Sequence, residues 1–546
     1  MRHHHAPARR AWAVAIPLIV LLAATGCISI SSGGSGSTSG RGETSATLPP
    51  GTLRVLAGSE LKDVEPLLGD LRAATGVNLH FDYTGTLDGA ERLTSGDQYD
   101  LAWFSSARYL MLLTEQGGRG RPVASERIML SPVVLGVKRS VAGRFGWTGS
   151  KPVTWSDIAA KAKSGQLRYG MTNPAASNSG FAALVGVASA FAGTGGALQT
   201  KDIDTARLTG FFSGQALTAG SSGWLADAYV GAQDRLDGLI NYESVLLGLN
   251  AGGKLHEPLQ LIYPKEGIVT ADYPLLLMNT AKRAEYDKVV GWLRSPDVQR
   301  RLMSTTARRP AVASVPADRR FGTQVLVEVP FPASRAVVDQ LLVAYLDKLS
   351  KPAHTIYVLD TSGSMEGDRI ASLRSAFANL AGADTSLSGR FARFRKRERV
   401  TILPFSDQAG ERRDFTVDAT TPDSASLADI RRYVDSLQPE GGTAIFTALQ
   451  QAYQAVAHDA AADRGYYTSV VLMTDGENKS GLTVDDFLSW QQSLPEDTRA
   501  VKTFAIRFGE ADAGELRRVA DASGGRLFDA SSGALQDAFK EIRGYQ

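Results

Sequence analysis

The sequence of 546 residues contains a single cysteine, Cys27, so no disulfide can form within the chain. An excess of one charge is also lacking: 59 basic and 57 acidic residues leave a net charge of +2. Such a balanced surface gives no strong field for nucleic acid, which we do not expect as a partner. The 7 histidines are scattered beyond His3–His5, and this spread argues against a histidine-rich zinc site.

Signatures of common enzymes are missing as well. No G-x-x-x-x-G-K-[ST] motif occurs, because Gly253 and Lys254 are followed by leucine, so a nucleotide-binding P-loop is not expected. "SELK", from Ser59 to Lys62, fits the S-x-x-K motif of penicillin-binding enzymes, but no S-D-N accompanies it. Since no nucleophile–base set emerges, we expect a binding protein and not an enzyme.

A long apolar run occurs only near the N-terminus, where "AWAVAIPLIVLLAAT" follows the basic "MRHHHAPARR". Small residues then precede Cys27, and residues 1–27 resemble a bacterial lipoprotein signal peptide in which Cys27 is lipidated. An uncleaved membrane anchor is the alternative, and both place the remainder outside the cytoplasmic membrane. We expect a lipid-anchored protein on the outer face of that membrane. The Gly/Ser-rich residues 28–50 are predicted to be a flexible tether.

From residue 51 onward, short apolar strands alternate with amphipathic helical stretches, a pattern typical of a parallel sheet covered by helices. In such sheets the ligand crevice lies beyond the carboxyl ends of the strands. The predicted strand ends carry small polar residues, namely Ser59, Thr86, Ser105 and Ser106. Further along, "TNPAASNSGFAALVGVASAF" places Ser177 and Ser179 at the start of an apolar helix. That is either an anion-friendly helix terminus or an ordinary N-cap.

The ordered segments "VLAGSE", "FDYTGT", "DLAWFSS", "SPVVLGVKR", "TNPAASNSGFAAL", "INYESVLL" and "YPKEGIVTADYPLLLMNTA" resemble the extracellular solute-binding proteins of ABC importers, near the molybdate, sulfate and phosphate binders. The resemblance implies a two-lobed domain at 51–330, with lobe one at 51–130 and 270–320 and lobe two at 131–269. It implies a small solute, for which an oxyanion is one candidate class. By motif position, the implied ligand-facing residues are Ser59, Thr86, Ser105, Ser106, Ser177, Ser179, Tyr242 and Glu243.

"VEVPFPASRAVVDQLLVAYLDKLSKPAH" predicts a bridging strand, a helix and a proline break, and it contains the connecting segment 331–351. A second alternating α/β region then begins, and we assign it to residues 352–546. "RFRKRER", residues 393–399, leads into one of its strands and is interpreted as a solvated loop, with contact to an anionic lipid or wall polymer as the alternative.

Five oxygen-bearing residues follow the predicted strands of this second region. Asp360, Ser362 and Ser364 lie in "VLDTSGSMEG", Thr443 follows two glycines in "PEGGTAIFTAL", and Asp475 ends the strand in "VVLMTDGEN". Because strand ends of a parallel sheet share one edge, these groups are expected to converge. Carboxylates and hydroxyls without Cys or His suit a hard cation, Mg²⁺ or Mn²⁺.

The order DxSxS…T…D resembles the metal-ion-dependent adhesion site (MIDAS) of the von Willebrand factor A (VWFA) domain. The resemblance implies that Ser362 and Ser364 ligate the metal directly, and that Thr443 does so when a partner is bound. Asp360 and Asp475 would act largely through water. The partner would be a protein that presents an acidic residue to the metal.

The sequence therefore predicts an α/β protein in which a two-lobed, periplasmic-binding-protein-like fold precedes a Rossmann-like doubly wound VWFA domain. Two functions remain open. In one, the protein is a receptor that captures a small solute and docks a protein partner. In the other, it is an adhesion or assembly factor whose solute-binding fold is only a scaffold.

Overall fold

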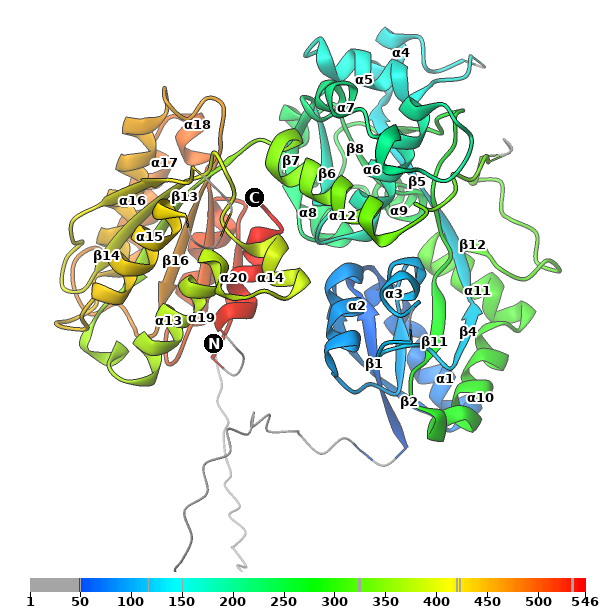
Figure 1. The fold of residues 1–546 in the computed structure, drawn as a ribbon, viewed down its shortest axis with the longest axis horizontal. Helices are drawn as coiled ribbons and strands as arrows, with labels where there is room; N and C mark the ends of the chain where they lie inside the picture. The colour runs from blue at the N-terminus through cyan, green and yellow to red at the C-terminus, as the bar shows by residue number, and fades with distance from the viewer. Residues whose placement is uncertain are drawn as a thin grey trace, which may run out of the picture. The chain divides into compact units, whose positions relative to one another are not determined.

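The computed structural model describes residue 49 and residues 51–546, except 116, 150, 323–325, 419–420, 422–423 and 532–534. The predicted signal peptide, Cys27 and the predicted tether up to residue 48 lie outside the described residues. Among the described helices, none is both long enough and apolar enough to cross a bilayer. The helices and strands are labelled in Figure 1.

The first sheet has the strand order β2-β1-β3-β11-β4. β1 (Thr52–Gly58) runs parallel to β2 (Asn78–Thr84) and to β3 (Leu101–Trp103), as the strand–helix alternation predicts. β11 (Pro274–Leu277) pairs in the antiparallel direction with β3 and with β4 (Ala124–Arg127), so the chain leaves this sheet after β4 and returns at β11. The accompanying helices are η1 (Ser59–Leu67), α1 (Leu68–Thr75), α2 (Thr86–Ser95), α3 (Arg108–Leu113), η4 (Thr280–Lys282), α10 (Arg283–Leu293) and α11 (Pro296–Thr306).

The second sheet has the order β10-β5-β8-β6-β7, and its longest strand, β5 (Met129–Lys138), also pairs with β9 and β12. β10 (Thr270–Ala271) and β12 (Arg309–Pro310) both pair with the first half of β5, where the chain passes between the two sheets. The other strands are β6 (Tyr169–Thr172), β7 (Gln215–Ala219), β8 (Gly238–Tyr242) and β9 (Leu259–Ile262). The accompanying helices are α4 (Arg139–Phe145), α5 (Trp155–Lys163), α6 (Asn178–Ala192), η2 (Thr200–Asp202), α7 (Thr205–Phe212), α8 (Ser222–Ala232), η3 (Gln233–Arg235) and α9 (Glu243–Ala251).

The connecting segment is mainly helical. α12 (Arg335–Ala344) buries Val338, Leu341 and Leu342, and a π-helical turn, η5 (Tyr345–Leu349), follows it. In place of the predicted bridging strand, the structure has an isolated bridge between Ile268 and Glu328. The prolines in "VEVPFPAS" explain this difference, because a proline has no N–H to give to a ladder.

The third sheet has the order β15-β14-β13-β16-β17-β18, and all its strand pairs are parallel except that of β14 with β15. Every residue of β13 (Ala353–Asp360) is buried, which is typical of a strand covered by helices on both faces. The other strands are β14 (Arg399–Phe405), β15 (Arg413–Thr416), β16 (Tyr467–Thr474), β17 (Lys502–Arg507) and β18 (Arg526–Asp529). The helices are η6 (Gly363–Met365), α13 (Asp368–Ala378), η7 (Asn379–Ala383), α14 (Leu387–Ala392), α15 (Ala425–Ser436), α16 (Ile445–Asp459), α17 (Val484–Gln492), α18 (Glu496–Arg499), α19 (Ala513–Ala522) and α20 (Leu535–Arg543).

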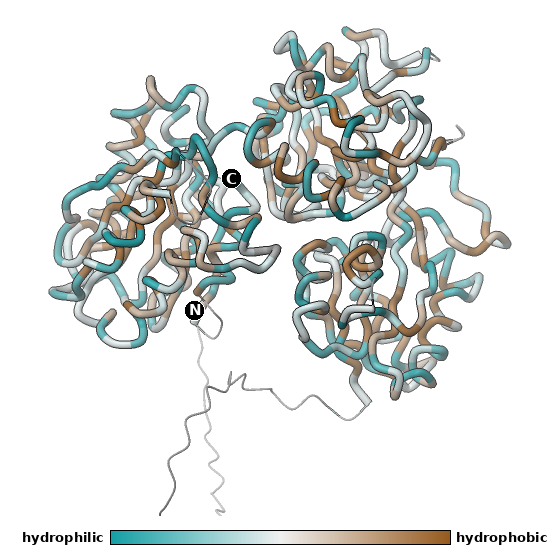
Figure 2. The backbone as a smooth tube through the Cα atoms, in the orientation of Figure 1, coloured by the Kyte–Doolittle hydropathy of each residue, from teal (hydrophilic) through white to brown (hydrophobic). Residues whose placement is uncertain are grey.

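Side chains of alternate residues in β13 enter different apolar clusters. Tyr357 and Leu359 join a cluster with residues of α13, α15 and α20, whereas Ile356 and Val358 join one with residues of α16, α17 and α19. A strand places successive side chains on opposite faces, so this region is a doubly wound sheet. Figure 2 shows hydrophobic stretches in the interior of the fold and hydrophilic segments in many outer loops. The predicted α/β fold class is confirmed.

Candidate metal centre and solute-binding residues

The five residues predicted to bind a metal lie in three loops at one edge of the third sheet. Asp360 is the last residue of β13, and Ser362 and Ser364 come directly after it. Asp475 follows β16, which is parallel to β13. Thr443 stands two residues before α16. The carboxyl ends of the strands therefore bring together residues more than 100 positions apart in the sequence.

Hydrogen bonds join four of these residues into one cluster. Oδ1 of Asp360 accepts a hydrogen bond from the backbone N–H of Ser362, with 2.8 Å between N and O. The Oγ atoms of Ser362 and Ser364 are 3.0 Å apart, and Oγ of Ser364 donates to Oδ1 of Asp475 at 2.9 Å. Oδ2 of Asp360 accepts from the hydroxyl of Thr474 at 2.6 Å. These hydrogen bonds hold the loop in place.

The fifth residue, Thr443, has a buried Oγ1 with no hydrogen-bond partner in the described part of the chain. It borders the cluster, since a Cβ added to Gly476 would lie 3.7 Å from both Thr443 Oγ1 and Ser364 Oγ. Gly441 allows the chain to turn here, because its φ is +73° and a Cβ would meet the carboxylate of Asp407. A buried hydroxyl without a partner costs free energy. A divalent cation would supply that partner, so the residues present fit a metal.

The acidic groups of the cluster are strongly dehydrated. Asp360 and Asp475 are both fully buried. Burial raises the pKa of Asp360, although hydrogen bonds from Ser362 and Thr474 act in the opposite direction. In the described residues no group of three or more His, Cys, Asp or Glu side chains could hold a metal, so a site here depends on hydroxyl groups as well as carboxylates.

A basic residue that the sequence analysis missed lies at the same edge. Arg369, on α13, donates from Nη1 to Oδ2 of Asp475 at 2.5 Å, and the Arg369 side chain is about one-third exposed. A guanidinium in this place supplies positive charge to a carboxylate that the metal would also need. Arg369 would therefore compete with a metal for Asp475.

Replacing Arg369 with glutamine is expected to raise the apparent affinity for Mg²⁺ by roughly 1.5- to fivefold, which corresponds to the loss of one partly exposed ion pair. The measurement is the melting temperature of the whole chain as a function of the Mg²⁺ concentration. Arg432→Gln is the matched control, because Arg432 is an exposed residue of α15 that pairs with Asp429. An unchanged or lower Mg²⁺ affinity in Arg369→Gln would show that the two cations do not compete.

The structure brings three of the predicted solute-binding residues into one hydrogen-bonded group. The Tyr242 hydroxyl donates to Oγ of Ser105 at 2.9 Å, and Thr86 Oγ1 lies 3.1 Å from the same atom. Ser105 follows β3 and Thr86 begins α2, both in the region of the first sheet. Tyr242 ends β8 of the second sheet. All three are buried. The strand ends of the two sheets thus meet here, as the two-lobed fold implies.

Two further predicted residues form an adjacent group. Ser177 precedes α6 as its N-cap residue and Ser179 lies in its first turn. Oγ of Ser179 is 2.8 Å from Oγ1 of Thr172 and 2.7 Å from Oγ of Ser222. Nδ2 of Asn178 donates to the Tyr242 hydroxyl at 3.2 Å and so links the two groups.

Glu243 differs from the other predicted residues. Its carboxylate is fully buried and accepts hydrogen bonds from Nε and Nη2 of Arg309, at 2.7 and 2.8 Å, and from the hydroxyl of Tyr263. The remaining candidates are Ser106, whose Oγ accepts from the backbone N–H of Arg108 at 3.3 Å, and Ser59, whose Oγ is buried without a partner among the described residues. Glu243 is therefore committed to an ion pair, whereas Ser59 is available to a ligand.

Family models match both halves of the described chain. Residues 53–305 match the bacterial extracellular solute-binding protein family, and residues 356–541 match the von Willebrand factor type A domain. The chain joins a solute-binding domain to a VWFA domain. Both resemblances read from the sequence are thereby confirmed. A solute-binding domain of this family implies an extracytoplasmic location.

Curated relatives of this VWFA-containing chain include inter-alpha-trypsin inhibitor heavy chain H4 from Sus scrofa, 26% identical over 208 residues, and from Bos taurus, 28% identical over 207 residues. The alignments cover 35% and 36% of this chain but only 20% and 21% of those relatives, about a fifth of their length.

Solved structures similar to the solute-binding domain include the periplasmic binding protein P5PA, 16% identical over 55% of this chain and 100% of that one, with a TM-score of 0.41. The sulfate-binding protein SubI from Mycobacterium tuberculosis H37Rv is 18% identical over 48% of this chain and 88% of that one, with a TM-score of 0.38. A von Willebrand factor type A structure from Catenulispora acidiphila is 20% identical over 36% and 42%, with a TM-score of 0.28.

Proposed function

We propose that this protein is a lipid-anchored receptor on the outer face of the cytoplasmic membrane, which captures a small solute and docks a protein partner through a divalent cation. The observation that carries the docking half is the convergence of five oxygen-bearing residues at one sheet edge, where Thr443 Oγ1 is buried without a partner in the described residues. Cys27 would carry the lipid, and the function is binding and not catalysis.

The metal residues have different tasks in this proposal. Ser362, Ser364 and Thr443 would hold Mg²⁺ or Mn²⁺, and the carboxylates of Asp360 and Asp475 would supply its counter-charge. The bound cation would offer a coordination position to a carboxylate of the partner protein. Hydrogen bonds from Ser362 and Thr474 keep the carboxylate of Asp360 oriented toward this loop.

The proposal is tested by capturing proteins from the cell envelope on the immobilised mature chain in Mg²⁺ and in EDTA. Specific partners are expected in Mg²⁺ and lost in EDTA. Ser364→Ala should lose them too, because it removes one hydroxyl of the exposed loop. Ser372→Ala is the matched control, since its hydroxyl donates to the Asp368 carbonyl on the surface of α13. Equal capture by wild type and Ser364→Ala would contradict metal-dependent docking.

The second candidate, an adhesion or assembly factor with a solute-binding fold as scaffold, is favoured by one observation. Most predicted solute-binding residues are buried and already bonded to one another, as in the contact of Tyr242 with Ser105. The two functions differ in their response to solute: a receptor is stabilised by its ligand, whereas a scaffold is not.

A further inference from the structure

We infer that the solute captured by the first domain bears an ammonium group, and that the carboxylate of Glu60 receives it. This inference rests on the solute-binding half of the proposed function and names the class of its ligand. Glu60 directly follows Ser59, one of the predicted solute-binding residues, in "SELK".

Glu60 stands where the first strand ends, in the second position of η1. Its Oε1 is buried and has no hydrogen-bond partner in the described part of the chain, and the same is true of Oγ of the preceding Ser59. The hydroxyl of Tyr273, a fully buried residue, also has no partner there. Native proteins rarely leave buried polar atoms unpaired, so this group of atoms indicates a missing ligand.

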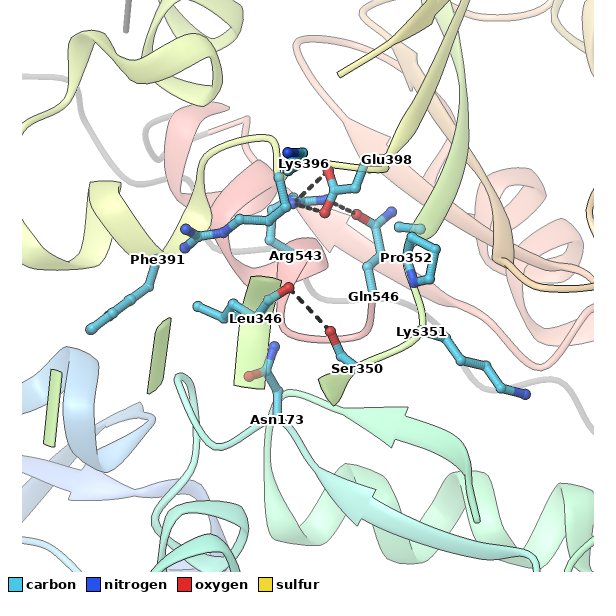
Figure 3. Close-up of a pocket in the computed structure, with 12 residues that line it drawn as sticks. Asn173, Leu346, Ser350, Lys351, Pro352, Phe391, Lys396, Glu398, Arg543 and Gln546 are labelled. Atoms are coloured by element: carbon cyan, nitrogen blue, oxygen red, sulfur yellow. Dashed lines mark hydrogen bonds and ion pairs between the residues drawn. The ribbon is translucent and has the colours of Figure 1, made fainter. Parts of the chain in front are cut away.

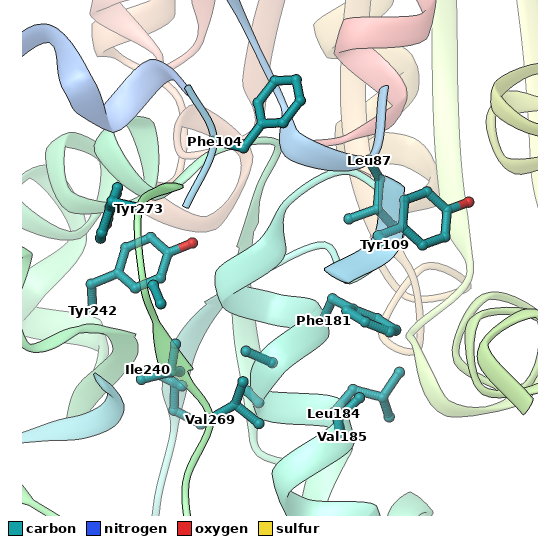
Figure 4. Close-up of a cluster of buried hydrophobic side chains, with 14 of the residues drawn as sticks. Leu87, Phe104, Tyr109, Phe181, Leu184, Val185, Ile240, Tyr242, Val269 and Tyr273 are labelled. Carbon is teal, nitrogen blue, oxygen red and sulfur yellow. The ribbon is translucent and has the colours of Figure 1, made fainter. Parts of the chain in front are cut away.

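Two tyrosines lie beside this carboxylate. The rings of Tyr242 and Tyr273 are 5.9 Å apart in an edge-to-face arrangement, and Figure 4 shows them as neighbours. Burial is the largest cause of the raised pKa of both hydroxyls. The negative charge of Glu60 raises both as well, as the second cause for Tyr242 and after the opposing charge of Arg308 for Tyr273. Aromatic rings beside a carboxylate are a favourable setting for a cation, and the guanidinium of Arg308 already lies over the Tyr273 ring, 4.6 Å from its centroid.

Tyr273 is held in this position at a cost. Its φ is +39°, in the left-handed region that bulky side chains avoid. The backbone N–H of Tyr273 donates to the Ser105 carbonyl at 3.1 Å, and its own carbonyl accepts from Nε1 of Trp103 at 3.1 Å. Such strain persists where surrounding contacts enforce it and is frequent at ligand sites.

The charges around Glu60 do not favour an anion. The nearby guanidinium of Arg308 is already bound by Asp63, with both carboxylate oxygens 2.7 Å from Nη1. Its Nη2 donates to the backbone carbonyl of Glu60 and not to the carboxylate, and its buried Nε has no partner among the described residues. One guanidinium thus faces two carboxylates, which leaves an excess of one negative charge. An oxyanion would be repelled, whereas an ammonium group would complete the balance.

Burial raises the pKa of Glu60, and the charge of nearby Asp63 raises it further. A backbone hydrogen bond, the charge of Arg308 and an interaction with Ser105 act in the opposite direction. Because the protonated carboxyl group attracts a cation less strongly, affinity for an ammonium ligand should fall as the pH is lowered through this pKa. The tyrosines Tyr242 and Tyr273 stay neutral over that range, since burial raises both of their pKa values.

The test measures the melting temperature of the mature chain with matched probes: choline against 3,3-dimethyl-1-butanol, glucosamine against glucose, and sulfate, phosphate and molybdate as anions. At least one ammonium probe should stabilise the protein, and its neutral partner should bind at least about tenfold more weakly, as expected when a charge-assisted contact is lost. Glu60→Gln should weaken the ammonium probe by a similar factor. Glu126→Gln is the control, because Glu126 is a half-exposed residue that pairs with Arg294.

Three outcomes would overturn the inference. A response to anions alone, or an ammonium response that survives in Glu60→Gln, would refute the ligand class while leaving solute capture intact. No response to any probe would refute the ligand class and also count against the solute-binding half of the proposed function. The Mg²⁺-dependent docking of the VWFA domain is measured separately and would be unaffected.

Discussion

Asp360→Asn is expected to abolish the stabilisation that Mg²⁺ gives to the protein. At a Mg²⁺ concentration of 100 times the dissociation constant, the wild-type chain should gain about 2.7 kcal/mol, and a hundredfold weaker variant should gain only about 0.4 kcal/mol. The reason is that Asp360 brings a buried negative charge to the hydroxyl cluster, and asparagine removes the charge while keeping the shape. The measurement is a Mg²⁺ titration of the melting temperature at neutral pH.

The same variant should not be less stable than the wild type in EDTA. Burial raises the pKa of Asp360, so the folded chain disfavours its ionised form more than the unfolded chain does. With a raised pKa, stability falls as the pH rises through that pKa, and at neutral pH the ionised carboxylate is a net cost. Asparagine removes this cost and can still accept from the N–H of Ser362.

Asp368→Asn is the matched control for the metal response. Asp368 is an exposed residue in the first turn of α13, so the variant loses the same charge outside the cluster. It should cost about 0.3–1 kcal/mol through the helix dipole and keep the full response to Mg²⁺. If Asp360→Asn kept a Mg²⁺ affinity within twofold of the wild type, the metal would lie elsewhere.

The convergence of the candidate metal residues was predictable from the sequence, because these residues occupy positions that the fold fixes. Asp360 and Asp475 end parallel strands, and the carboxyl ends of such strands share an edge whatever the loops do. Arg369 was not predictable in the same way. It lies on a helix, and its contact with Asp475 depends on the direction that a long, partly exposed side chain takes.

The solute-binding residues show the same limit. Strand ends identified Ser105 and Thr86, and the family resemblance identified Tyr242; the structure joins the three by hydrogen bonds. Arg308 and its partner Asp63 are 245 positions apart, and no local pattern indicates that they meet. The charge around these residues therefore could not be counted from the sequence, and the ion pair of Glu243, an implied ligand-facing residue, with Arg309 could not be foreseen either.

The interpretation of residues 393–399 as a solvated loop was wrong in part. Lys396 and Arg397 are exposed, but Arg395 and Glu398 are buried. Glu398 pairs with Arg543 of α20, whose Nη2 lies 2.7 and 2.9 Å from the two carboxylate oxygens (Figure 3). A charge run indicates solvent exposure only when no distant residue of opposite charge covers it, and here the C-terminal helix does so.

This buried pair gives the second large expected effect. Arg543→Met should destabilise the protein by about 3–5 kcal/mol, because it leaves the carboxylate of Glu398 without its counter-charge in an environment that water barely reaches. The side chains of Arg543 and Glu398 are only 7% and 8% exposed. In the melting temperature this corresponds to a fall of roughly 6–20 °C for a domain of this size. Thermal unfolding of the whole chain measures it.

Two comparisons separate the buried charge from other losses. Combining Arg543→Met with Glu398→Gln should recover part of the stability, since glutamine carries no charge. Recovery should be incomplete, because Arg543 also donates to the backbone carbonyls of Ala392 and Arg393. Arg432→Met, which removes the arginine of an exposed pair, should cost less than about 1 kcal/mol. A similarly small cost for Arg543→Met would mean that water reaches Glu398 and that α20 is not fastened to the sheet through this pair.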